Sequence, residues 1–156
     1  MSRGFTLTLV LISGLFFSCV SGPAHGESPQ RSPGYQTVAR GSYSGVLSQR
    51  EVLIESEAAF ERLWRELHSG RSPVPQKPSI NFETHQIAAV FAGEKPSGGF
   101  SVEVTTIQTE EDYLTIYFQE QSPSPGDIVT QALTQPYHIV QFPRTERDIR
   151  FRSRSQ

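Results

Sequence analysis

The side chains that could carry out acid–base, nucleophilic or metal chemistry are few and far apart in this chain. Its 156 residues include one cysteine and four histidines. The cysteine, Cys19, lies in an apolar N-terminal segment. His68, His85 and His138 are expected at a helix end, in a loop and in a strand, and none of them has a second histidine at the i, i+4 spacing that places two metal ligands on one helix face. We therefore expect no metal ion and no other cofactor.

Three short patterns are similar to functional motifs but have simpler explanations. Residues 41–45 read Gly-Ser-Tyr-Ser-Gly, with Tyr43 where a nucleophile elbow requires serine. The acidic run 110–112 falls in an expected turn and lacks a second carboxylate for general acid–base catalysis. The arginines near the C-terminus alternate with other residues, which is typical of a soluble edge strand, a binding patch for anionic surfaces being the alternative. The sequence thus predicts that the protein is not an enzyme, since a hydrolase would need a cleft gathering His85 or His138 with carboxylates.

One loop has a composition that restricts its shape. It runs from residue 93 to 100, and it contains Pro96, Ser97, Gly98, Gly99 and Phe100. Proline fixes one backbone dihedral and the two glycines permit positive φ, so the chain can turn sharply into the next strand. A stiff loop with a hydrophobic tip loses little ordering entropy when it binds another protein. The spacing of the proline and the glycines alone favours a purely structural role for this loop as a turn. Binding of a partner protein is the alternative role.

The elements expected around this loop form an α+β layout. Four apolar residues at i, i+3, i+4 and i+7 follow the N-cap residue Ser56, which predicts a helix that faces the core and ends at Ser69-Gly70. Runs rich in β-branched and aromatic residues predict strands at 43–46, 52–54, 87–91, from residue 100, 113–118, 137–142 and around 149–151. The predicted fold class is α+β: a mostly antiparallel sheet with one amphipathic helix packed on it.

The N-terminal segment is typical of an export signal. Arg3 precedes an apolar run that ends near residue 20, and small or helix-breaking residues follow. Two cleavage sites are open: after Gly26, which makes residues 1–26 a signal peptide, or before Cys19 in a degenerate lipobox, which makes residues 1–18 a lipoprotein signal and Cys19 the lipidated residue. We expect a flexible leader over 27–37, one domain over 38–152, and export to the cell envelope or periplasm if lipid-anchored, or secretion otherwise.

Charge and hydropathy limit the classes of partner. The formal net charge is −2, and removal of residues 1–26 takes away only Arg3 among the charged side chains, so that it becomes −3. A basic field for nucleic acid is therefore absent, and we expect no nucleic-acid partner. No later segment approaches the roughly 18 consecutive apolar residues of a membrane span, so the only membrane contact we expect is an anchor on Cys19.

Four segments together resemble the PrcB C-terminal domain family, over residues 54–142. They are Ile80-Asn81-Phe82, the strand and glycine of 87–93, the turn 95–100, and Leu133-Thr134-Gln135-Pro136-Tyr137-His138-Ile139-Val140. The chain departs from the family pattern with Ser97 for threonine, Phe100 for tyrosine and Asn81 for aspartate. The resemblance implies a noncatalytic domain of exported bacterial proteins, often lipoproteins, that assembles or stabilises a partner protease.

A second likeness supplies an alternative function. The segment 96–100, followed much later by Gln135-Pro136-Tyr137, is similar to the loops of chagasin-type inhibitors of cysteine proteases, which wedge into the active site. This likeness adds Pro136 and Tyr137 to the candidate partner-binding residues. It also predicts that the Pro136-Tyr137 corner lies next to the 96–100 loop. The two functions considered are therefore an accessory subunit of a protease and an inhibitor of cysteine proteases.

Overall fold

The computed structural model describes residues 32–154, which form one helix and seven strands. The elements are β1 (Gln36–Gly41), β2 (Gln49–Ile54), α1 (Glu57–Leu67), β3 (His85–Ala92), β4 (Ser101–Thr109), β5 (Tyr113–Gln121), β6 (Tyr137–Pro143) and β7 (Asp148–Ser153). The predicted signal segment, Cys19 and residues 27–31 of the predicted leader lie outside the described residues. Within residues 32–154, no helix is long and apolar enough to cross a membrane.

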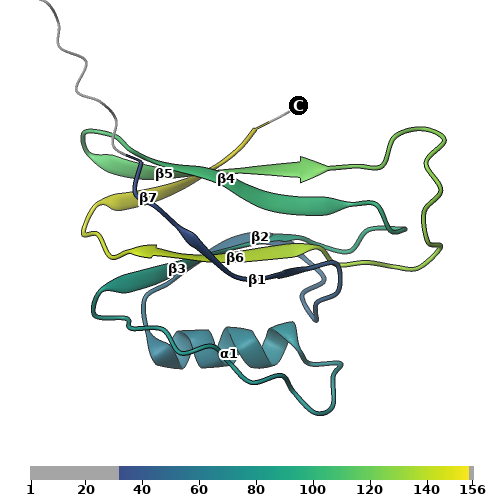
Figure 1. Cartoon of the computed structure of the whole chain (residues 1–156), viewed down its shortest axis with the longest axis horizontal. Coiled ribbons are helices and arrows are strands. Elements are labelled where there is room, and N and C mark those ends of the chain that lie inside the picture. Colours follow the sequence, from purple (N-terminus) through teal and green to yellow (C-terminus); the bar gives the residue numbers. More distant parts are fainter. Residues whose placement is uncertain (1–31, 155–156) are drawn as a thin grey trace, which may run out of the picture.

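The strands form two sheets that pack face to face (Figure 1). The first has the order β1-β6-β3-β2 and is antiparallel throughout. The second has the order β4-β5-β7, and its outer pair β5–β7 is parallel. Helix α1 covers the face of the first sheet that points away from the second (Figure 1). The predicted α+β class is confirmed, but the expectation of a single sheet was wrong, because β6 inserts into the first sheet and β7 returns to the second.

Helix α1 begins and packs as its sequence predicts. The Ser56 side chain accepts a hydrogen bond from the backbone N–H of Ala59, which satisfies one of the free donors of the first turn. The apolar stripe is buried against the first sheet, and its members are Phe60, Leu63, Trp64 and Leu67. The Trp64 indole donates to the Pro75 carbonyl at 2.8 Å. Trp64 is therefore a core residue, as the spacing indicates.

The C-terminal end of α1 is stabilised in an unexpected way. Gly70 does not have a positive φ, and His68 caps the helix instead. The Leu67 carbonyl accepts a hydrogen bond from Gly45 N at 2.9 Å, so the β1–β2 connection satisfies a free helix acceptor. His68 is 3% exposed and neither ring nitrogen has a hydrogen-bond partner among the described residues. Burial and the nearby Arg71 lower the pKa of His68, which disfavours the charged imidazolium that would interact favourably with the negative end of the helix dipole.

The core has two parts because β3 is buried on both faces. Ile87, Ala89 and Phe91 face α1, whereas Ala88 and Val90 face the second sheet. The strand therefore reads as one continuous apolar run rather than as an alternation, as predicted for residues 87–91. The second cluster, between the sheets, also contains the inward side chains of β4 and β5.

A β-bulge changes which residues of β4 face the core. The pairing with β5 shifts between Val104 and Thr106, so the regular alternation of inward and outward side chains along the strand stops at Val104. Ile107, at 1% exposed, takes the next inward position instead of Thr106. The extra residue, Thr105, is the one that local periodicity does not reveal.

His138 joins the two sheets beside this bulge. Its Nδ1 accepts a hydrogen bond from the backbone N–H of Val104 at 2.9 Å, and its Nε2 lies 2.8 Å from the Thr37 hydroxyl on β1. Since an N–H can only donate, Nδ1 is unprotonated and the proton of the neutral ring sits on Nε2, which donates to Thr37. Burial is the main cause of the lowered pKa of His138. The Glu103 charge opposes this shift, and the Arg40 charge adds to it.

The first strand lies earlier in the chain than expected. Residues 43–46, predicted as a strand, form the connection between β1 and β2, and Tyr43 is 49% exposed. The strand that pairs with β6 is β1, which begins at Gln36, inside the segment expected to be a leader. It is an edge strand with a bulge near Thr37, and so it has little apolar alternation.

Candidate functional site

Three long connections meet at one end of the molecule. They span residues 42–48, 93–100 and 122–136, and the segment 68–74 that leaves α1 joins them (right-hand end of Figure 1). We call these four segments the loop end. The opposite end has the first described residues, the β4–β5 turn and the β6–β7 turn.

The 93–100 loop is fastened to the segment before β6. Lys95 and Thr134 exchange backbone hydrogen bonds at 2.8 and 3.1 Å, and the Thr134 hydroxyl donates to the Ser97 carbonyl at 2.7 Å. Gly98 N donates to the Thr130 carbonyl at 2.9 Å. These bonds hold the 93–100 loop against residues 130–134, the segment that leads to the Pro136-Tyr137 corner.

Two glycines in this loop have conformations that disfavour a side chain. Gly93 has φ +74° and Gly99 has φ +85°. A Cβ on Gly99 would lie 2.9 Å from Pro123 and from Val129, so the loop packs closely against the β5–β6 connection. Phe100 is half-buried, with the Lys95 ammonium 5.9 Å from its ring centre. The loop is therefore held by its neighbours, which agrees with the expectation of a stiff turn.

The β1–β2 connection is fastened at three points. Gly45 N bonds to the end of α1, the Ser42 carbonyl accepts from Gln135 N at 2.8 Å, and the Leu47 carbonyl accepts from Glu94 N at 3.0 Å. Val46, at 2% exposed, fills the core beneath. Each segment of the loop end is thus hydrogen-bonded to another one, so the surface is preorganised.

The loop end carries the large exposed apolar side chains. Among residues 32–154 these are Tyr43, Leu47, Val74, Ile128 and Leu133, which are 48–104% exposed. All five lie in the loop-end segments. Exposed apolar side chains scattered singly are ordinary, but their concentration on one surface is typical of a protein-binding site. Sequence reasoning missed them because periodicity assigns Tyr43 to a strand and gives no signal for apolar residues within loops.

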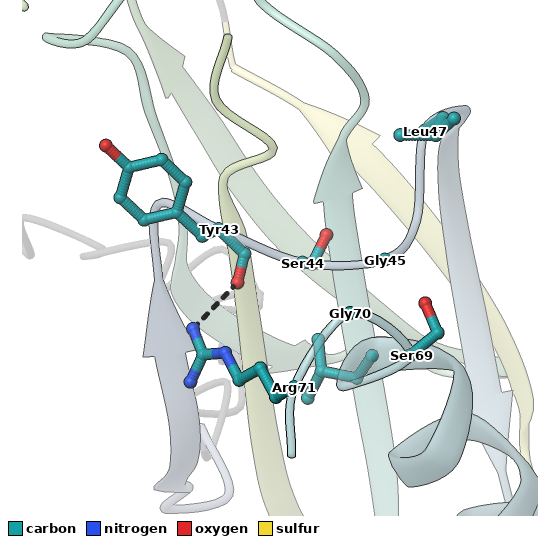
Figure 2. A pocket seen from close by; sticks show the side chains of 8 residues that line it. Tyr43, Ser44, Gly45, Leu47, Ser69, Gly70 and Arg71 are labelled. Atoms are coloured by element: carbon teal, nitrogen blue, oxygen red, sulfur yellow. Dashed lines mark hydrogen bonds between the residues drawn. The ribbon is translucent and has the colours of Figure 1, made fainter. Parts of the chain in front are cut away.

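A hollow of about 380 Å³ opens between the β1–β2 connection and the end of α1 (Figure 2). Arg71 is its charged residue, and the guanidinium points to the Tyr43 carbonyl, to which it donates at 3.4 Å. Figure 2 also shows the Ser44 and Ser69 side chains at the hollow and Leu47 at its rim, while the Tyr43 ring points away from Arg71. The hollow is an open surface feature of mixed polarity beside the exposed apolar residues.

Two of the predicted partner-binding residues are interior. Pro136 is buried and Tyr137 is 6% exposed. The Tyr137 ring stacks on Phe91 with centroids 6.4 Å apart, and a Cβ on Gly41 would lie 3.1 Å from that ring. Burial raises the pKa of its hydroxyl, against the opposing effect of Arg71. Because Tyr137 begins a central strand and is buried, its side chain offers little surface to a partner. Exposed or half-exposed positions remain at 96–100.

The histidines do not form a joint site. In the β3–β6 pairing His85 lies opposite Pro143 and His138 opposite Val90. Five residues along a strand separate them by about 17 Å, at roughly 3.3 Å per residue. His68 lies at the end of α1, against Trp64. In the part of the chain that the structure describes, no group of three or more His, Cys, Asp or Glu residues could hold a metal ion.

The fold is thus a mostly β domain with one helix and a preorganised loop surface. Residues 87–143 match the family model described as PrcB C-terminal. The match covers β3 to β6 and both candidate loops, and it confirms the resemblance inferred from the sequence. It suggests a protease-associated accessory domain. Comparison with curated proteins and with solved structures gives no match.

Proposed function

We propose that this chain is a noncatalytic accessory domain that binds a protease, or another subunit of a protease complex, through its loop end. The observation that carries the proposal is the gathering of Tyr43, Leu47 and Leu133 with the other exposed apolar residues on that one surface. The family match supports the protease-associated class.

The physical basis is burial of apolar surface on a prearranged site. Few residues carry most of the energy of a protein interface, and aromatic and large apolar side chains near its centre are the usual ones. Leu47 is 63% and Leu133 is 57% exposed. The Leu47 carbonyl accepts from Glu94 N, and Thr134, next to Leu133, exchanges two backbone bonds with Lys95, so binding orders little chain.

Cross-linking from the loop end tests this proposal. A photoreactive amino acid at Leu47 or Leu133, in cells of the source organism, should cross-link to the same protein, and mass spectrometry should identify it as a protease or a protein bound to one. The control position is Ala58, an exposed residue in the first turn of α1. Equal products from Ala58 would contradict a loop-end site, and one specific product unrelated to proteases would contradict the protease partner.

We further propose that the protein is exported, with residues 1–26 or 1–18 as the signal. The Cys19 version predicts that a labelled fatty acid is incorporated into the protein and that Cys19→Ser abolishes the label. Fractionation of the same cells provides the second measurement. An unlabelled protein recovered outside the cytoplasm supports cleavage after Gly26, whereas an uncleaved chain in the cytoplasm contradicts export.

The inhibitor alternative is the less favoured one. A wedge into a protease active site requires a protruding tip, whereas the Pro136-Tyr137 corner is buried against Phe91 and Gly41. We therefore expect no inhibition of papain at micromolar protein, as measured by titration of its activity.

A further inference from the structure

Strand β7 is an open edge of the second sheet. Its inner side pairs with β5, and the Arg154 backbone N–H continues that pairing with the Phe118 carbonyl at 2.8 Å. Because backbone groups alternate in direction along a strand, those of Ile149 and Phe151 point away from β5. Within residues 32–154 no other strand pairs with β7. These backbone donors and acceptors are therefore available to an added strand.

The outer face of this edge is cationic. Arg150, Arg152 and Arg154 are exposed, and none of them forms an ion pair within 4.0 Å in the described part of the chain. The Arg150 guanidinium lies 3.8 Å from the ring centre of Tyr113, and that of Arg154 lies 4.2 Å from Tyr117. Stacking on the tyrosine rings holds two guanidinium groups against the sheet without neutralising them.

The inner face of the same edge is apolar. Ile149 and Phe151 pack against the cluster between the sheets, yet both stay half-exposed. An added strand would extend the buried layer beside them. From Ile149 to Arg152 the side chains thus alternate between apolar on one face and cationic on the other, with a period of two residues.

This alternation indicates which kind of strand would pair with β7. A second copy of the chain that paired antiparallel through its own β7, with Phe151 opposite Phe151, would place Arg150 opposite Arg152, and like charges directly across a sheet destabilise the pair. A strand with carboxylates on the outer face and apolar side chains on the inner face would match both rows. Charge complementarity therefore favours an acidic segment of another protein over self-association.

We propose that β7 binds an extended segment of a partner polypeptide in which acidic residues alternate with apolar ones, as a fourth strand of the second sheet. The segment hydrogen-bonds to the backbones of Ile149 and Phe151, and its carboxylates pair with Arg150 and Arg152. This site is separate from the loop end and does not depend on the function proposed for it.

A peptide-binding experiment tests the proposal. The probe is a fluorescent peptide of alternating Glu and Val, added to the purified full chain, with anisotropy as the readout. The double variant R150E/R152E should bind it at least about tenfold more weakly, which is the effect of losing about 1.4 kcal/mol. The same variant should instead bind a peptide of alternating Lys and Val. The matched control R62E/R65E changes the same charge on the exposed face of α1 and should leave binding unchanged.

Amide exchange tests the geometry independently of charge. Hydrogen exchange at the Ile149 and Phe151 amides should slow at least about tenfold when the Glu–Val peptide is bound, because those N–H groups then donate to the added strand. Binding without this protection contradicts strand addition. Arginine-dependent binding to vesicles with phosphatidylglycerol, with no binding of the peptide, would assign the surface to a membrane and overturn the proposal. Absence of both would mean that the arginines only protect an edge strand.

Discussion

Replacing His138 by alanine should lower the free energy of unfolding by about 3–5 kcal/mol. The imidazole is 1% exposed, so its removal leaves a cavity between the sheets. It also removes the acceptor of the Val104 N–H and the donor to Thr37, and a buried group without a partner costs about 1–3 kcal/mol. Urea unfolding of the two proteins, followed by circular dichroism, measures the difference.

Two variants separate the ring from its partners. Thr37→Val removes only the hydrogen bond from Nε2 and should cost about 1 kcal/mol. His85→Ala changes a histidine at the start of β3 whose ring contacts the neighbouring Thr84, and it should have little effect. If His138→Ala proved no worse than His85→Ala, the His138 ring and its hydrogen bonds to Val104 and Thr37 would contribute nothing to stability.

The same histidine should make stability depend on pH. Its pKa is lowered in the folded protein by burial, as is that of His68. The unfolded chain therefore takes up protons first as the pH falls below about 6.5, the ordinary histidine pKa. Stability is complete above that pH and decreases toward the lower folded-state pKa, and His138→Ala should weaken this dependence between about pH 7.5 and 5. An unfolding midpoint that rises toward pH 5 would contradict the argument.

Gly45→Ala should destabilise the protein by about 3 kcal/mol or more and distort the loop end. A Cβ at this position would lie 2.2 Å from the Glu66 carbonyl oxygen and 2.1 Å from the Ser69 hydroxyl. The serine side chain can rotate away, but the carbonyl belongs to the last turn of α1, so the backbone must move. That movement stretches the bond from Gly45 N to the Leu67 carbonyl, now 2.9 Å.

Gly70→Ala is the matched control. It lies beyond the same end of α1, has no positive φ, and a Cβ there would meet nothing within 4 Å. The substitution should change the free energy of unfolding by no more than about 0.5 kcal/mol, as for an open surface site. Cross-linking through Leu47 should also fall in Gly45→Ala and persist in Gly70→Ala. Equal unfolding midpoints for the two variants would show that the β1–β2 connection is not packed as described.

The parts of the fold that were predictable are those with a strong local pattern. Ser56 and the apolar stripe define α1, and the run 87–91 defines a strand buried on both faces. The edge strand β1 escaped prediction because its partners, chiefly β6, are distant in sequence. The bulge at Thr105 escaped it because one inserted residue leaves no trace in composition.

The candidate site was predictable only in part. Gly99 and Pro96 indicate a stiff turn, and the structure has one that is hydrogen-bonded to Thr130 and Thr134. The burial of Tyr137 depends on its pairing with Phe91, which no local motif encodes. Exposure of Leu47 and of the other loop residues likewise follows from the complete fold, since an apolar residue in a loop can equally be buried in the core, as Val46 is next to Leu47.

The position of β6 determines when the molecule can form. This strand lies between β1 and β3 in the first sheet, so β1 has no neighbour to pair with until residues 137–143 have been synthesised. The second sheet likewise lacks β7 until residues 148–153 have been synthesised. Such distant pairings make folding slow, because a long chain must close before any contact compensates for the lost entropy. A nascent chain that lacks residues 137–153 therefore cannot complete either sheet, and an incompletely folded chain is the state in which a polypeptide can thread through a narrow translocation channel, as the export proposed above would require.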